Sequence, residues 1–150
     1  MKDYNFRDYK FRGIKRSPYG DQWVSGYYAW QDGQHTIIMP YIEGFCKSVK
    51  EGKALPLISV SHDIDISTLG QYTGLKDING KEIYEGDIVA EKGHYVKSDK
   101  ILYQKIQWKD TYSCWLRGEY QRLTPKNIKT YQIEVVGNIY ENSDLLNKEE

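Results

Sequence analysis

The sequence predicts a mainly β protein, a small barrel or sandwich for which an SH3-like arrangement is one variant, with N-terminal β-hairpins and one or two short helices. Tyrosine is abundant, with 14 residues against 3 phenylalanines, and aromatic side chains suit the half-buried face of a sheet. Short segments alternate apolar and polar residues, as strands do. The pairs Asp32-Gly33 and Asn79-Gly80 divide such segments, and both are typical of hairpin turns.

The first 60 residues predict hairpins and one helix. Ser17-Pro18-Tyr19-Gly20 predicts a turn, because proline fixes φ and glycine tolerates the left-handed region. Between residues 41 and 50, apolar residues recur at the spacing of one helical face. We therefore expect residues 1–60 to form a hairpin region with a short helix, packed on a barrel-like core of residues 61–150. The expected elements are strands at 22–30, 35–39 and 55–60 and a helix at 41–50.

The middle of the chain carries the clearest turn. Asn79-Gly80 favours a two-residue type I′ turn, which requires a positive φ at both residues. Such a turn would place Asp77 opposite Glu82, and like charges directly opposite each other are unfavourable. A looser loop that separates the two carboxylates is therefore the alternative.

Strands are also predicted after this turn. A bulge at Gly86 would bring Ile83 and Ile88 to the same face of one strand. Asn142-Ser143-Asp144 is expected to cap a final short helix. Alternation predicts three sets of side chains that each share a face: Leu102, Ile106 and Trp108; Tyr112, Cys114 and Leu116; and Tyr131, Ile133, Val135 and Ile139.

Several segments carry a recognisable pattern. They read FRG at 11–13, QYTGLKD at 71–77, NGKEIYEGDIV at 79–89 and EVVGNIYEN at 134–142, whereas residues 31–60 carry none of it. This pattern resembles the YopX family, which consists of small proteins from phages and prophages of Gram-positive bacteria. The resemblance implies a mainly β protein encoded by a phage or prophage. It brings no assigned activity, and hence no catalytic residues.

The net charge is zero, but the charged residues are unevenly distributed. Residues 1–16 carry six Lys or Arg against two Asp or Glu, and residues 91–129 carry nine against four. Residues 60–90 carry two against six, and the tail from Tyr131 carries one against five. This alternation favours attraction between segments or between copies of the chain, and it does not make a uniform field for nucleic-acid phosphates.

No apolar run approaches the roughly 18 residues of a membrane span, and no basic-apolar leader is visible. We therefore expect no membrane partner and a location in the cytoplasm of a bacterial host. The two cysteines, Cys46 and Cys114, are too few for a disulfide framework, and we expect them to be reduced thiols in the core.

The sequence predicts no catalytic, cofactor-binding or metal-binding residues, and so no enzyme. His62-Asp63-Ile64-Asp65 raises the question of a metal site, but no second His or Cys lies at ligand spacing, so a surface loop is preferred. Glu82, Glu85 and Asp87 are the best candidates for an acid, a base or a metal ligand. We expect these carboxylates instead to accept backbone hydrogen bonds at a sharp turn.

Aromatic residues fall on both faces of one predicted strand, so we expect this strand to be covered, either by the rest of the chain or by another subunit. If it is exposed, it is an apolar patch of the kind that marks a binding surface. We expect a non-catalytic, self-associating interaction protein, with a phage or host protein as a further partner. The alternative is a single-stranded nucleic-acid-binding protein, in which rings stack on bases and cations hold phosphates. For residues 1–16 a purely structural alternative is a charged edge strand. The candidate residues are Trp23, Tyr27, Tyr28 and Trp30 with Arg7 and Arg12; the nucleic-acid alternative adds Lys10, Lys15, Arg16 and the basic segment 91–129.

Overall fold

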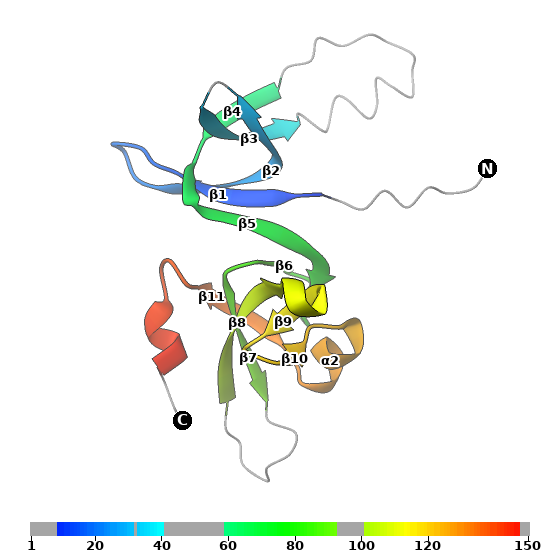
Figure 1. Ribbon diagram of the computed structural model, residues 1–150. Coiled ribbons are helices and arrows are strands. Elements are labelled where there is room, and N and C mark those ends of the chain that lie inside the picture. The colour runs from blue at the N-terminus through cyan, green and yellow to red at the C-terminus, as the bar shows by residue number, and fades with distance from the viewer. Residues whose placement is uncertain (1–8, 32, 41–58, 93–100, 148–150) are drawn as a thin grey trace, which may run out of the picture. The chain divides into compact units, whose positions relative to one another are not determined.

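The computed structural model describes residues 9–31, 33–40, 59–92 and 101–147, and these form two compact regions (Figure 1). We call Tyr9–Gln71 the N-terminal region and the chain from Tyr72 onwards the C-terminal region. The packing of residues 1–60 on the remainder stays a prediction. The predicted helix at 41–50, the predicted strand residues 55–58, Arg7 and Cys46 lie outside the described residues.

The mainly β prediction is confirmed, since antiparallel strands dominate both regions and, among the described strands, no pairing closes a sheet into a barrel. The N-terminal region contains β1 (Phe11–Lys15), β2 (Gln22–Gln31), β3 (Gln34–Pro40), β4 (Ser59–Asp63) and the first part of β5 (Asp65–Lys76). The C-terminal region contains β6 (Glu82–Tyr84), β7 (Asp87–Lys92), β8 (Ile101–Lys109), the 3-10 turn η1 (Asp110–Tyr112), β9 (Cys114–Arg117), β10 (Gln121–Arg122), the helix α2 (Pro125–Thr130), β11 (Glu134–Asn138) and the 3-10 turn η2 (Ser143–Asn147).

The sheet of the N-terminal region has the strand order β4-β3-β2-β1-β5. Strands β2 and β3 form the predicted hairpin around Asp32-Gly33, and Gly33 has a φ of 83°, which glycine adopts without strain. The predicted turn at 17–20 is also confirmed, because the Gly20 amide donates to the Ser17 carbonyl at 3.0 Å. The turn residues were therefore sufficient to predict these two connections, β1 to β2 and β2 to β3.

Strand β1 lies inside the sheet, where it pairs with β2 on one side and β5 on the other. The edge-strand alternative is therefore wrong for β1. The pairing with β5 is interrupted, because Arg12 pairs with Gly70 whereas Ile14 pairs with Asp65. The buried Thr68 hydroxyl closes this bulge: it accepts from the Ile14 amide at 2.8 Å and donates to the Asp65 carbonyl at 2.6 Å.

The C-terminal region contains a sheet of order β10-β9-β8-β7-β11, and β6 pairs with the second part of β5. The helix α2 begins where Thr124 caps it, because the Thr124 hydroxyl accepts from the Asn127 amide and Pro125 takes the first helical position. Its buried residue, Ile128, joins the main apolar cluster. That cluster contains Ile83, Val89, Ile106, Leu123, Ile128, Ile133 and Val135, with Leu75, Trp115 and Tyr131 packed against it.

The turn between β5 and β6 is the looser alternative, and the type I′ prediction is wrong. Gly80 has a φ of 85°, but Asn79 does not have a positive φ. The Gly80 amide donates to the Asp77 carbonyl at 3.1 Å, which gives a three-residue loop that ends in a left-handed glycine. Glu82 consequently pairs with Lys76 rather than with Asp77, so the like charges are separated.

Ile83 and Ile88 are both fully buried, but the predicted bulge at Gly86 is wrong. The strand ends instead, and a turn at residues 85 and 86 separates β6 from β7, with Gly86 at a φ of 81°. The buried Asp87 carboxylate accepts from the Tyr84 amide at 2.7 Å across this turn. The break places β6 and β7 in different sheets, and Val89 rather than Ile88 joins Ile83 in the main apolar cluster.

Alternation predicted the faces of β8 and β9 less well than those of β11. Ile106 and Leu116 are buried, whereas Leu102, Trp108 and Tyr112 are exposed, because alternation gives the face of a strand but not how far the core extends along it. Cys114 is a free thiol that is only partly buried, so the core prediction is wrong for this cysteine.

The end of the chain follows the predicted alternation only as far as Val135, because the pairing register shifts between Val135 and Gly137, so that Asn138 is buried and Ile139 is only partly buried. Ile133 and Val135 are buried on either side of the exposed Glu134, as the alternation of this segment requires. The expected final helix is the 3-10 turn η2, in which the Leu145 amide donates to the Asn142 carbonyl at 3.0 Å. Among the described residues, no helix is long and apolar enough to cross a membrane.

Candidate interaction surface

The aromatic residues of β2 divide between the two faces of the sheet, because successive strand residues point in opposite directions. Trp23 and Tyr27 share one face with Arg12, which pairs with Ser25 on the neighbouring strand. The Arg12 guanidinium lies over the Trp23 ring, with its Cζ atom 4.7 Å from the ring centroid. Such a cation–π contact holds both side chains against the sheet. Tyr27 lies further along the same face and is 50% exposed.

Tyr28 and Trp30 share the other face of β2. The Tyr28 hydroxyl and His35 Nδ1 are 2.7 Å apart in a hydrogen bond, and the Phe11 ring lies 5.8 Å from the Tyr28 ring, centroid to centroid. Trp30 pairs with His35 across the hairpin, next to its turn, and is 64% exposed. Of the four aromatic residues predicted to interact, Trp23 and Tyr28 are therefore partly covered by neighbours, whereas Tyr27 and Trp30 are open to solvent.

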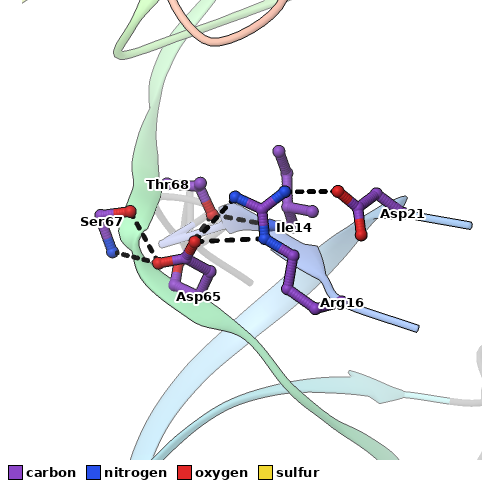
Figure 2. Close-up of polar contacts among 6 residues, drawn as sticks. All are labelled: Ile14, Arg16, Asp21, Asp65, Ser67 and Thr68. Atoms are coloured by element: carbon purple, nitrogen blue, oxygen red, sulfur yellow. Dashed lines mark hydrogen bonds and ion pairs between the residues drawn. The ribbon is translucent and has the colours of Figure 1, made fainter. Parts of the chain in front are cut away.

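Arg16, a basic residue of the nucleic-acid alternative, is engaged within the chain (Figure 2). Its Nη2 and Nε atoms donate to Asp65 Oδ2 at 2.8 and 3.2 Å, and its Nη1 atom pairs with Asp21. Asp65 also accepts from the Ser67 hydroxyl at 2.6 Å and from the Ser67 amide at 3.0 Å. The hydrogen bonds from Ser67, followed by those from Arg16, lower the pKa of Asp65, and the same pairing raises the pKa of Arg16.

The segment His62-Asp63-Ile64-Asp65 is not a surface loop. His62 and Asp63 end β4 and Asp65 begins β5, so only Ile64 lies between the two strands. Asp65 is committed to the Arg16 contacts. Across the described ranges, no group of three His, Cys, Asp or Glu side chains is placed to hold a metal ion.

Two of the three carboxylates considered for acid–base chemistry, Glu82 and Asp87, have structural partners, whereas Glu85 lies in the turn between β6 and β7. Asp87 fixes the turn between β6 and β7 through the Tyr84 amide, as the sequence predicted. Glu82 Oε2 accepts from the Tyr84 hydroxyl at 2.7 Å. The whole region around Tyr84 is thus held by the carboxylates that flank it.

A buried ion pair in the C-terminal region was not predicted. Arg117 and Glu91 are each less than 5% exposed, and Arg117 Nη1 pairs with Glu91 Oε2 from across the sheet. The Arg117 guanidinium also lies over the Tyr131 ring, 4.5 Å from its centroid. Burial lowers the pKa of Arg117. Alternation contained a signal for the burial of Glu91, which follows the buried Val89 by two residues and so shares its face, but not for its pairing with Arg117.

The family model described as YopX protein matches residues 26–147. The chain belongs to the YopX family. The match includes residues 31–60, in which the YopX pattern was not visible, and it begins after the FRG segment at 11–13. The crystal structure of protein EF1440 from Enterococcus faecalis is similar to this YopX chain at 22% identity and a TM-score of 0.42, and the alignment covers 97% of this chain and 83% of that one. No curated protein matches.

Proposed function

We propose that this chain is a non-catalytic interaction protein, encoded by a phage or prophage and acting in the bacterial cytoplasm, which self-associates through the aromatic ribbon of β2. The ribbon consists of Trp23, Tyr27, Tyr28 and Trp30. The observation that carries the proposal is the exposure of Tyr27 and Trp30 on a sheet that fixes their backbone. Large aromatic side chains with little conformational freedom are enriched at protein interfaces and supply much of their binding energy.

A second copy of the chain is the partner we favour. The net charge is zero, so two copies do not repel each other strongly, and the chain alternates between basic and acidic segments. Tyr27 and Trp30 lie on opposite faces of β2, so each face presents one open ring to a neighbour. Two of the three carboxylates considered for catalysis, Glu82 and Asp87, are hydrogen-bonded to Tyr84, which supports a role without chemistry.

Self-association is tested by the molar mass of the full chain, measured by size exclusion with light scattering over a range of concentrations. We expect a mass above that of one chain, and we expect Trp30→Ser to raise the dissociation constant about tenfold or more, the effect of losing an interface anchor. Tyr120→Ser is the matched control, because Tyr120 is 78% exposed but lies in the C-terminal region. A strictly monomeric wild-type chain at high concentration contradicts the proposal, and so does an unchanged mass for Trp30→Ser.

The second candidate function is binding of single-stranded nucleic acid at the same ribbon. The stacking of Arg12 on Trp23 favours it, because arginine and aromatic rings together hold bases and phosphates in such proteins. The acidic partners of Arg16 count against it. Fluorescence anisotropy with a labelled oligothymidylate distinguishes the two functions: binding at low salt that weakens steeply as salt rises supports the nucleic-acid function. No binding at low salt excludes it.

A further inference from the structure

A small open cavity lies in the C-terminal region, between the loop after β5 and the helix α2. Its volume is about 230 Å³. The end of β5 contributes Gly74, Leu75 and Lys76, the loop after it contributes Asp77 and Ile78, and the helix contributes Pro125, Ile128 and Lys129. All of these residues belong to the C-terminal region, so the cavity is a feature of that region alone.

The floor of the cavity is apolar and rigid. Leu75 and Ile128 belong to the packed core or contact it, and Pro125 is fixed at the start of α2. Ile78 is 40% exposed, although turns normally carry polar residues at such positions. Its amide donates to the Ile133 carbonyl at 3.0 Å, which holds the loop against β11. The isoleucine side chain is therefore kept in the cavity wall by its own backbone.

The buried Asp77 carboxylate supports this wall but is occupied. Asp77 Oδ1 accepts from the Asn79 and Lys81 amides at 2.8 and 2.9 Å, and Oδ2 accepts from the Val135 amide at 2.9 Å. Hydrogen bonds from three amides satisfy the carboxylate and compensate much of its charge. The exposed charged side chains that line the cavity are those of Lys76 and Lys129, and Lys126 is also exposed one turn earlier on α2. Glu82 lies opposite Lys76 on β6, and its carboxylate accepts from the Tyr84 hydroxyl.

We propose that this cavity binds a short acidic peptide segment of a partner protein, with one aliphatic side chain inserted between Ile78 and Ile128. The flanking carboxylates of the peptide pair with Lys76 and Lys129. The cavity is smaller than the roughly 300–1,000 Å³ typical of small-molecule sites, and a volume of this size suits a single anchoring side chain. An apolar floor inside a cationic rim is complementary to an apolar anchor between acidic residues. The site is separate from the ribbon on β2 and does not depend on self-association.

The test uses the full chain labelled with ¹⁵N and a capped peptide of sequence Glu-Glu-Leu-Glu-Glu. We expect amide chemical shifts to change at residues 74–78 and 126–129, with weak affinity that falls as salt rises. A peptide with serine in place of leucine is expected to bind about tenfold more weakly, because the anchor is lost. Absence of shifts at millimolar peptide, or shifts centred elsewhere on the chain, overturns the proposal.

Two variants measure separately how the lysines at the rim and the apolar residues of the floor contribute to peptide affinity. Lys129→Glu is expected to weaken binding at least tenfold, whereas Lys92→Glu, which reverses an exposed lysine on β7, is the matched control and leaves binding unchanged. Ile78→Ser is expected to weaken binding while preserving its salt dependence. Equal affinity for the Lys129 and Lys92 variants contradicts the proposal. Trp30→Ser is expected to bind the peptide normally, so failure of self-association and failure of this site are distinguishable.

Discussion

The two regions bury their apolar side chains to different degrees. In the C-terminal region, buried residues from β6, β7, β8, β11 and α2 form a single cluster. In the described part of the N-terminal region, the buried apolar side chains are those of Ile14, Val24 and Ile37, whereas Trp30 and Tyr27 remain exposed. Both regions leave aromatic rings exposed, but the N-terminal sheet has few buried side chains among its described residues, so a partner that covers its rings would add a larger share to its buried apolar surface.

This difference assigns separate roles to the two regions. The C-terminal region contains the main buried apolar cluster and holds one of its turns through the contacts of Asp77 with three amides, although Trp108, Tyr112 and Tyr120 remain exposed. The N-terminal region relies on backbone pairing and on a few side-chain contacts, such as those of Thr68 and Arg16. We therefore expect the C-terminal region to carry most of the stability of the chain and the N-terminal region to gain stability on association.

The largest expected effect comes from truncating the core. Ile106→Ala should lower the free energy of unfolding of the C-terminal region by about 4 kcal/mol, because the surrounding cluster leaves a cavity that cannot collapse. Ile37→Ala should cost only about 2 kcal/mol, although Ile37 is equally buried, because fewer of the described side chains in its region are buried. Amide hydrogen exchange, read separately for each region, measures both values. Equal losses of unfolding free energy for the two variants would show that the two regions are packed to the same degree.

Turn and periodicity signals in the sequence were enough to predict the hairpin at Asp32-Gly33, the turn at 17–20 and the alternation through Ile133 and Val135. These features depend on φ preferences and on the period of a strand, which are properties of neighbouring residues. The exposure of Trp30 could not be predicted from turn or periodicity signals. It depends on which segments pack over each face of the sheet, and alternation does not contain that information.

Features that depend on contacts between distant segments were missed. The helix α2 was also not predicted. Thr124 and Pro125 together are a typical helix start, but the six residues of the helix are too few to show a helical period. The pairing of Glu91 with Arg117 joins β7 to β9 across β8, so sequence spacing could not reveal it. The cavity beside Ile78 requires the same long-range packing of the loop against α2.

A buried aspartate in the C-terminal region is expected to matter more than an exposed one. Asp77→Ala leaves three buried or partly buried amides without their acceptor, and we expect a loss of about 3 kcal/mol in the free energy of unfolding. Asp110→Ala is the matched control, because Asp110 accepts one exposed hydrogen bond from Trp108 Nε1, and its loss should cost less than about 0.5 kcal/mol. Urea denaturation of both variants measures the difference, and similar midpoints would show that the turn is not held by Asp77.

The smallest expected effect is a dependence on pH in the N-terminal region. Hydrogen bonds from Ser67 and Arg16 lower the pKa of Asp65 below its value in the unfolded chain, so the carboxylate stabilises the fold at any pH above that unfolded value, about 3.9. As the pH falls through the lower folded pKa, the carboxylate is protonated, and the stabilising contribution is lost.

Asp65→Asn should therefore flatten the acid limb of the plot of unfolding free energy against pH, between about pH 5 and pH 2, while leaving the alkaline side unchanged. Hydrogen exchange of the Ile14 amide, which donates to Thr68 beside Asp65, follows this loss locally. An acid limb of the same slope in the variant would show that other carboxylates, and not the contact between β1 and β5, set the acid sensitivity of this region.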